Sequence, residues 1–304
     1  MTLPVIVIVG PTAVGKTELS LTVAQQFDAD IINADSMQLY RGMNIGTAKI
    51  PANERRGITH HMLDVLDVTQ AANVADYQHE ARAIINQIHA RGKRVVVVGG
   101  SGLFVQGLLE DMQFPGSDPD VRQRLNEEAT RIGTQAMYER LASIDPEAAA
   151  NILPTNERRI IRALEVIELT GEAPTTTLAQ LPEIVPNIRV GLRRDRDDLD
   201  RRIEQRVELM WQQGLIDEVR DLDAQGLRDG LTASKALGYA QVLDYLAGDI
   251  QEDEAKLRTV TSTRRYVRRQ ESWFNRDEWI TWFDAASHTL TADVIAHINT
   301  RQNA

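Results

Sequence analysis

A loop-like segment, Gly10 to Thr17, directly follows an unbroken run of β-branched residues, Val5 to Val9. Such a run predicts a strand buried on both faces of a parallel sheet. The segment GPTAVGKT matches the pattern G-x-x-x-x-G-K-[ST], and a helical stretch follows it. In this setting, glycines allow backbone N–H groups to point inward and surround phosphate oxygens. The sequence therefore predicts an α/β domain that binds a phosphate chain.

The residues of this loop have separate expected roles. The expected phosphate-binding residues are Gly10, Pro11, Thr12, Ala13, Val14, Gly15, Lys16 and Thr17. The Lys16 ammonium can reach a terminal phosphate, and the Thr17 hydroxyl can ligate Mg²⁺, which is the expected cofactor. The loop alone does not specify which phosphorylated molecule binds there.

The rest of the chain continues the alternation of strands and helices and then interrupts it. We expect further strands at residues 30–33, 94–98, 188–192 and 279–283. Residues 118–187, in contrast, show helical patterns broken by prolines. We therefore predict a P-loop NTPase-like parallel sheet flanked by helices, formed by residues 1–117 and 188–304, with a mostly helical C-terminal region. Residues 118–187 are predicted to form a helical insertion domain.

Composition excludes several classes of protein and site. The chain has 304 residues, of which 42% are hydrophobic and 26% are charged, as in ordinary globular proteins. It contains no cysteine, which excludes disulfides, thiol nucleophiles, iron–sulfur clusters and cysteine-based zinc sites. The six histidines lack metal-ligand spacing, and the longest apolar run is too short to cross a bilayer. We expect a cytoplasmic monomer without a membrane segment.

Charge is unevenly distributed along the chain. The net charge of −10 argues against general binding to polyanions. Residues 256–276, however, contain seven basic residues and one acid, a local charge of +6 that leaves −16 on the rest. Tyr266, Trp273 and Phe274 are interleaved with these cations, which is typical of surfaces that stack and hold nucleic acid. A solvated basic helix whose aromatic rings point inward would have the same pattern.

A carboxylate follows the second predicted strand. Asp35 comes directly after it, so its side chain is expected at the carboxyl edge of the sheet, facing the phosphate loop. An acid at this place can orient an acceptor substrate or accept its proton. It can also be a solvated loop acid beside a helix cap supplied by Ser36. The long polar segment that follows, residues 37–49, is typical of a functional loop.

Three blocks of sequence together resemble the tRNA dimethylallyltransferase family. They are the phosphate loop GPTAVGKT, the segment DSMQLYRG at residues 35–42 and the segment IGTAK at residues 45–49. The resemblance continues through residues 59–64, 99–104, 159–166, 195–206, 236–239 and 268–274. In GGSGLF, at residues 99–104, the family more often has Thr and Tyr at the third and sixth positions. The lack of cysteine is similar to the bacterial form of the family, because the eukaryotic members carry a zinc finger.

The resemblance implies an activity and a role for several residues. The family transfers a dimethylallyl group from dimethylallyl diphosphate to N6 of the adenosine 3′-adjacent to the anticodon in tRNA, releasing diphosphate. The catalytic residues that it implies are Asp35, Thr17, Arg196 and Lys16. Asp35 would accept the proton of the amine, while the other three, with Mg²⁺ on Thr17, would stabilise the leaving diphosphate. Arg196 also fits an ordinary solvated helix start among acids.

The resemblance also implies a surface for the anticodon stem-loop of tRNA. The target adenosine must leave the base stack to reach a diphosphate held in a pocket. The implied tRNA-binding residues are Asp35, Ser36, Met37, Gln38, Ser101, Arg122, Arg158, Arg159, Ile160, Ile161, Arg162, Arg268 and Arg269. Ser101 is also a candidate helix N-cap.

Two other functions fit parts of the sequence. A P-loop kinase acting on a small metabolite would use Asp35 to hold the acceptor hydroxyl and residues 118–187 as a lid. It would not need the basic aromatic segment. A non-catalytic RNA-binding NTPase would use that segment but would leave Asp35 without a role. Salt-sensitive binding of tRNA distinguishes the kinase from the other two functions.

Overall fold

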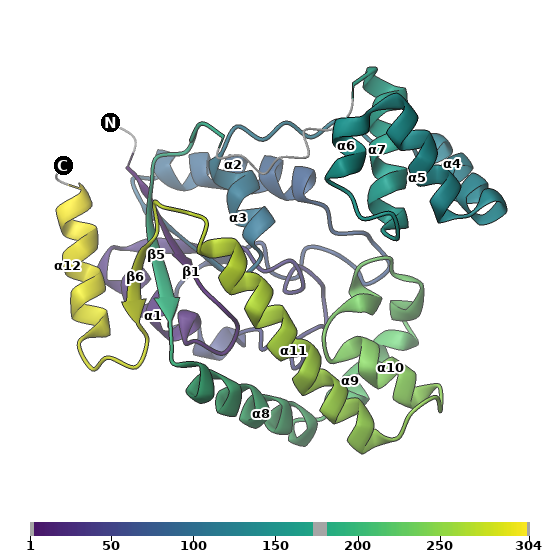
Figure 1. Cartoon of the computed structure of the whole chain (residues 1–304). Coiled ribbons are helices and arrows are strands. Elements are labelled where there is room, and N and C mark those ends of the chain that lie inside the picture. Colours follow the sequence, from purple (N-terminus) through teal and green to yellow (C-terminus); the bar gives the residue numbers. More distant parts are fainter. Residues whose placement is uncertain (1–2, 173–180, 303–304) are drawn as a thin grey trace. The chain divides into compact units, whose positions relative to one another are not determined.

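The computed structural model describes residues 3–172 and 181–302, and the chain divides into two compact units (Figure 1). One unit comprises Met1–Glu110 with Glu183–Ala304, and the other comprises Asp111–Pro182. We call them the sheet unit and the insertion.

The insertion differs at both ends from the expected interval of 118–187. Residues 183–187 belong to the sheet unit, because their backbone bonds to other residues of that unit. Glu183 forms an antiparallel bridge with Glu110, and the carbonyl of Pro186 accepts a hydrogen bond of 2.8 Å from the backbone N–H of Val5. At the other boundary, the N–H of Asp111 donates to the carbonyl of Pro182 at 2.9 Å. The chain therefore leaves the sheet unit and returns to it at neighbouring points.

The sheet unit is built on a parallel sheet that has six strands in the described part of the chain. They are β1 (Val5–Val9), β2 (Ala29–Asn33), β3 (His60–His61), β4 (Arg94–Gly99), β5 (Asn187–Arg193) and β6 (Thr281–Asp284). Their order is β3-β2-β4-β1-β5-β6, and all neighbours are parallel. The central place of β1 explains its continuous run of buried β-branched residues. The predicted P-loop NTPase-like sheet is confirmed, while the two-residue strand β3 is too short to leave a periodic pattern.

Helices cover both faces of the sheet. They are α1 (Lys16–Gln26), α2 (Val74–Ala90), α3 (Gly102–Leu109), α8 (Arg196–Gln212), α11 (Glu252–Phe274) and α12 (Leu290–Gln302). Successive residues of a strand point to opposite faces. Val5, Val7 and Val9 accordingly pack in one core with α2 and α3, whereas Ile6 and Ile8 pack in a second core with α1, α8 and α12.

A third core holds the long polar loop that follows β2. The short helices around it are α9 (Leu215–Asp223), α10 (Tyr239–Leu246) and the 3₁₀ turns η2 (Leu227–Asp229) and η3 (Ala233–Lys235). Another 3₁₀ turn, η1 (Ala52–Glu54), follows the loop and has no buried residue. Tyr40 and Met43 of the loop are buried in one cluster with α9 and α10. Lys49, buried at the end of the loop, donates hydrogen bonds of 2.6 Å to the carbonyl of Tyr40 and to Asp64. The loop is therefore packed against helices that lie far away in the sequence.

The insertion is helical in its described residues. Its helices are α4 (Pro119–Ile132), α5 (Thr134–Ile144), α6 (Pro146–Ala150) and α7 (Glu157–Thr170). The side chains of Asp118, Asp145 and Asn156 accept backbone N–H groups at the first turns of α4, α6 and α7. Leu125 and Met137 are buried in a core of its own. The insertion therefore has the all-helical structure that its sequence predicts.

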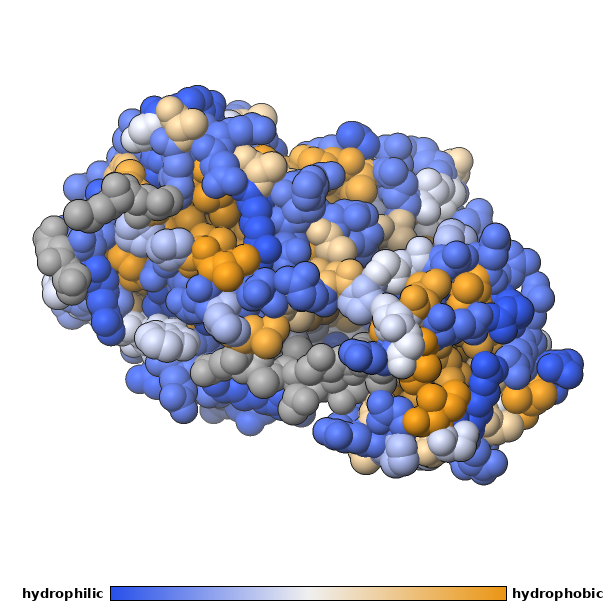
Figure 2. Space-filling model, turned by 90° about the horizontal axis from the view of Figure 1, so that it is seen from above, coloured by the Kyte–Doolittle hydropathy of each residue, from blue (hydrophilic) through white to orange (hydrophobic). Residues whose placement is uncertain are grey.

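The surface in Figure 2 is mainly polar, and apolar residues form separate patches on it. None of the helices in the two described stretches combines the length and the apolar character needed to cross a membrane.

Candidate active site

The phosphate loop leaves β1 at Gly10 and enters α1 at Lys16. Gly10 has a φ of +144°, and a Cβ atom there would lie 2.5 Å from the carbonyl oxygen of Leu192 in β5. Only a residue without a side chain fits this backbone next to the neighbouring strand. Gly15, at the N-terminus of α1, has a φ of +110°. The two glycines of the motif therefore set the path of the loop around the start of the helix.

Lys16 points back into the loop. Its ammonium group donates hydrogen bonds to the carbonyl oxygens of Gly10, at 2.9 Å, and Pro11, at 2.6 Å. Burial lowers the pKa of Lys16 to about 7, the charge of Asp35 opposes this shift, and Arg206 adds to it. A phosphate oxygen would supply the opposite charge that favours the ammonium form.

Asp35 is held at the carboxyl end of β2 by the last residue of that strand. The Asn33 side chain accepts a hydrogen bond of 3.0 Å from the N–H of Asp35 and donates to its carbonyl and to that of Met62, both at 2.9 Å. The Asp35 carboxylate accepts the N–H of Met37 at 3.0 Å. These bonds fix the carboxylate beside the phosphate loop.

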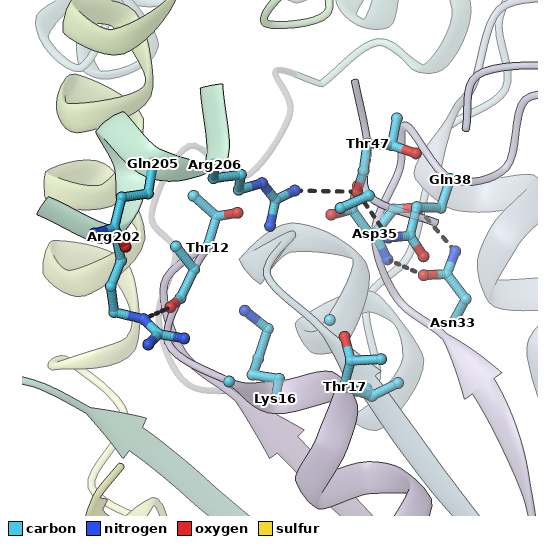
Figure 3. Close-up of a pocket in the computed structure, with 15 residues that line it drawn as sticks. Thr12, Lys16, Thr17, Asn33, Asp35, Gln38, Thr47, Arg202, Gln205 and Arg206 are labelled. Carbon is cyan, nitrogen blue, oxygen red and sulfur yellow. Dashed lines mark hydrogen bonds between the residues drawn. The ribbon is translucent and has the colours of Figure 1, made fainter. Parts of the chain in front are cut away.

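Two neighbouring cavities meet at Asp35. The first, about 340 Å³, is lined by the phosphate loop and includes Lys16 and Thr17 (Figure 3). The second, about 240 Å³, has a more apolar wall that includes Met37, Val207, Met210 and Leu237. Four residues line both cavities: Thr12, Asp35, Thr47 and Arg206. The structure thus brings a phosphate cradle, a carboxylate and an apolar pocket together within the sheet unit.

Two arginines of α8 face the first cavity, and they differ from the one expected there. Arg202 donates a hydrogen bond of 2.8 Å to the carbonyl of Ala13, and Arg206 donates one of 3.2 Å to the carbonyl of Thr47. Burial lowers the pKa of Arg206, and the charge of Asp35 opposes this shift. Arg196, the first residue of α8, is exposed and lines neither cavity. The sequence does carry a signal for these two residues: Arg202 and Arg206 are four positions apart, which places both on one face of a helix.

The basic helix α11 reaches the site through its buried side. Gln270 accepts a hydrogen bond of 3.0 Å from the N–H of Thr12 and donates one of 2.9 Å to the carbonyl of Gly100. Tyr266 and Arg269 line the second cavity, and the Arg269 guanidinium lies 5.7 Å from the centre of the Tyr266 ring. Burial, followed by the charge of Asp35, raises the pKa of Tyr266 to about 12. Its hydroxyl is therefore protonated at neutral pH and can donate a hydrogen bond.

The other residues near Asp35 have different surroundings. Ser36 and Met37 line the second cavity, and Gln38 lines the first and donates to the carbonyl of Thr47 at 3.1 Å. Ser101 lies at the N-cap position of α3, but its hydroxyl does not cap that helix. It accepts the N–H of Ser36 at 3.1 Å instead.

The expected tRNA-binding residues of the insertion fall into three kinds. Arg158 and Arg159 are exposed at the start of α7. Ile160 and Ile161 are buried in the core of the insertion, so a contact with tRNA cannot come from their side chains. Arg122 and Arg162 form the third kind, because both pair with one buried carboxylate.

That carboxylate belongs to Glu165 of α7. It accepts hydrogen bonds from Arg122 Nε, at 3.1 Å, and from Arg162, at 2.8 Å. Burial opposes the charged form of Glu165, but the hydrogen bonds of Arg122, Arg162 and Ser117 hold its pKa below the usual range. Arg122 and Arg162 thus stabilise the insertion itself. Arg268 of α11, in the sheet unit, is exposed like Arg158 and Arg159.

Comparison with known proteins gives consistent matches. A family model described as IPP transferase matches residues 38–277. The tRNA dimethylallyltransferase of Thermobifida fusca is 57% identical over 91% of this chain and 89% of its own length. That of Streptomyces avermitilis is 53% identical over 94% of this chain and 92% of its own.

Solved structures give the same result. The crystal structure of the tRNA isopentenylpyrophosphate transferase from Bacillus halodurans is 38% identical, with a TM-score of 0.73, and the match covers 99% of this chain and 98% of that one. A eukaryotic dimethylallyltransferase acting on tRNA is 28% identical, with a TM-score of 0.82, over 97% of this chain and 77% of the other.

Proposed function

The chain belongs to the IPP transferase family, and from this premise we propose that it is a tRNA dimethylallyltransferase. It transfers the dimethylallyl group of dimethylallyl diphosphate to N6 of the adenosine 3′-adjacent to the anticodon of tRNA, and diphosphate leaves. The observation that carries the proposal is the meeting of the two cavities at Asp35. A reaction between a diphosphate ester and a flat base needs a polar cradle and an apolar pocket that share one wall.

The first cavity suits the diphosphate. When the allylic C–O bond breaks, negative charge develops on the diphosphate oxygens, and groups already directed at these oxygens stabilise the transition state. The Lys16 ammonium and the guanidinium groups of Arg202 and Arg206 are cations that line this cavity. Because Arg196 is exposed outside it, we assign to Arg206 the role that the resemblance implied for Arg196.

The second cavity suits the acceptor base. The adenosine has to be turned out of the base stack to enter a pocket, and Tyr266 offers an aromatic face and a hydroxyl donor there. N6 attacks the carbon of the breaking C–O bond, and its proton passes to the Asp35 carboxylate, which is fixed by Asn33 and the N–H of Met37. Asp35 therefore acts as the general base.

Thr17 fits a divalent metal ion, and we propose Mg²⁺. Mg²⁺ keeps several waters and commonly takes one or two protein oxygens together with phosphate oxygens. The Thr17 side chain lines the cavity beside Lys16, and the described residues contain no cluster of three or more acids or histidines that could hold a metal. This donor set suits an ion held mainly by the diphosphate. When bound, the ion neutralises charge on the leaving group.

Exposed arginines suit the phosphates of the anticodon stem-loop. Arg158 and Arg159 on the insertion and Arg268 on α11 are all exposed, and Arg269 lies at the second cavity. Both cavities are lined by residues of a single sheet unit, which supports a monomer, and the substrate supports a cytoplasmic location. The small-metabolite kinase that the phosphate loop alone permits is not supported by the comparisons.

The test supplies the protein with Mg²⁺, unmodified tRNA, labelled dimethylallyl diphosphate and γ-labelled ATP. We expect prenyl label on the tRNA adenosine, and a loss of roughly 10²–10⁴-fold in turnover for Asp35→Ala. Asp221→Asn, at an exposed position of α9, is the matched control and should retain the wild-type rate.

The other outcomes reject separate parts of the proposal. Transfer that survives Asp35→Ala would remove the general base but keep the activity. Label from ATP on a small acceptor would indicate the kinase. Binding of tRNA without any transfer would indicate the non-catalytic NTPase.

A further inference from the structure

The carboxylate of Glu218, on α9, is held by three successive backbone N–H groups of the loop after β2. It accepts hydrogen bonds from Asn44 at 3.1 Å, from Ile45 at 2.8 Å and from Gly46 at 3.4 Å. The hydroxyl of Tyr239 donates to the same carboxylate at 2.5 Å. One side chain therefore anchors a loop that lies more than a hundred and seventy positions earlier in the sequence.

The anchored loop segment has little freedom to shift. Gly46 packs on the ring of Tyr239 so closely that a Cβ atom would overlap it. Tyr239 is fully buried in the core formed with α9. Burial and the charge of Glu218 raise the pKa of Tyr239, so its hydroxyl keeps the proton that it donates. Glu218 and Tyr239 thus hold the backbone of residues 44–46 in place.

Thr47, the next residue, links this fixed segment to the two cavities. The carbonyl of Thr47 accepts hydrogen bonds from Arg206, at 3.2 Å, and from Gln38, at 3.1 Å. The Thr47 hydroxyl donates to the carbonyl of Met43 at 2.7 Å. Thr47 lines both cavities, whereas Glu218 lines neither. A displacement of residues 44–46 would therefore move the acceptor that holds the Arg206 guanidinium.

We propose that Glu218 is a positioning residue for Arg206: through residues 44–46 and the carbonyl of Thr47, it fixes the guanidinium at the phosphate-binding cavity. That the ligand is a diphosphate rests on the proposed function. Glu218 touches no substrate in this arrangement, and it acts only through the arginine. The effect of Glu218 on binding should therefore disappear when Arg206 is absent. The effect of a residue that merely stabilises the fold would remain.

A double-mutant cycle on the binding of inorganic diphosphate tests the proposal. Calorimetry with Mg²⁺ compares wild type, Glu218→Gln, Arg206→Gln and the double variant. We expect each single substitution to weaken binding by roughly tenfold, since each removes or misplaces a hydrogen bond to a charged group. In the Arg206→Gln background, Glu218→Gln should change the affinity by less than about twofold. Losses that simply multiply, or a Glu218→Gln protein that binds like wild type, would overturn the proposal.

Two further variants keep the test decisive. Glu80→Gln, at an exposed position of α2, is the matched control and should bind diphosphate like wild type. If Glu218→Gln fails to fold, Tyr239→Phe removes only the hydroxyl that orients the carboxylate, and its smaller loss should likewise vanish in the Arg206→Gln background.

The readout also separates this proposal from the proposed function. Absence of prenyl transfer in the wild-type protein would reject the transferase, while the coupling between Glu218 and Arg206 in diphosphate binding would still be measurable.

Discussion

Gln270, in the last two turns of α11, accepts a hydrogen bond of 3.0 Å from the backbone N–H of Thr12, which lies 258 positions earlier in the chain. The same side chain donates to the carbonyl of Gly100. The phosphate loop and the loop after β4 are thus joined by one amide. Arg268 of the same helix is exposed, so one helix carries both an exposed arginine and a hydrogen bond to the phosphate loop.

Replacing Gln270 by leucine is expected to destabilise the protein and weaken diphosphate binding together. The Thr12 N–H and the Gly100 carbonyl would lose their partner, and an unsatisfied buried polar group costs roughly 1–3 kcal/mol. Urea unfolding and diphosphate calorimetry measure the two effects. Ser272→Ala, at an exposed position two residues further on, is the control. Wild-type affinity in Gln270→Leu would show that the bond does not shape the loop.

The pKa of Lys16 predicts how the affinity for diphosphate depends on pH. Its pKa is about 7 in the free protein, and a bound diphosphate raises it, because the negative charge favours the ammonium form. Binding therefore takes up a proton above pH 7, and affinity should fall there by up to about tenfold per pH unit, while it is level below. The measurement is the difference between wild type and Lys16→Met, because the titration of the ligand is common to both. Parallel pH profiles would contradict the prediction.

The buried carboxylate of Asp30, at the other end of β2, predicts that the stability of the fold decreases in acid. Burial opposes the charge of Asp30, but hydrogen bonds from His61 and Lys93 hold its pKa below the ordinary value of 3.8. Because the folded-state pKa is the lower one, its stabilisation is complete above pH 3.8 and disappears as the pH falls through the folded value. Asp30→Asn should cost about 1.5–3 kcal/mol at neutral pH, because it removes the charge from the hydrogen bonds that the buried side chain forms with His61 and Lys93.

The control for Asp30 is the same substitution two residues earlier. Among the residues that the structure describes, Asp28 forms an ion pair with Lys93 alone, at 3.4 Å, and its side chain is 84% exposed. Asp28→Asn should therefore change the free energy of unfolding by less than about 0.5 kcal/mol. Denaturant unfolding at several pH values should show the stability difference between wild type and Asp30→Asn shrinking in acid. A difference that is constant with pH would rule out the charge of Asp30 as its cause.

The arginines of the insertion are expected to separate into two groups. Arg158→Gln and Arg159→Gln should each weaken tRNA binding and lower its salt slope by about 1, with unchanged thermal stability, because both residues are exposed. Arg162→Gln should instead lower the melting temperature, since it leaves buried Glu165 with one cation fewer. Filter binding over a salt series and thermal unfolding distinguish the groups. Equal effects of all three on the salt slope would contradict this division.

The parts of the site that lie close together in the sequence could be predicted. The strand β1, the phosphate loop and the start of α1 form one continuous segment, so their arrangement follows from a local pattern. Asp35 could be placed because it follows the end of β2, and the carboxyl ends of parallel strands share one edge of the sheet. Periodicity also separated the helical insertion from the sheet unit.

The remainder depends on how distant elements pack. The sequence shows an apolar face on α8, with buried Leu199 and Ile203, but not which arginine of that helix faces the phosphate loop. The packing of α8 on the sheet turns Arg202 and Arg206 toward the first cavity and leaves Arg196, two to three turns before Arg206, exposed. Glu218 could not be found at all, because its partners are backbone N–H groups of a loop that has no regular structure.

The pairing of Glu110 with Glu183 has a consequence for folding kinetics. Val5 of β1 must find Asn187 of β5 across the whole insertion, and a long separation in sequence slows such a pairing. The contacts within the insertion are local and helical, which favours early formation. Once the insertion is folded, its two ends lie next to each other. The length of flexible chain between β1 and β5 is then shorter. Early folding of the insertion therefore offsets the length that it adds between β1 and β5.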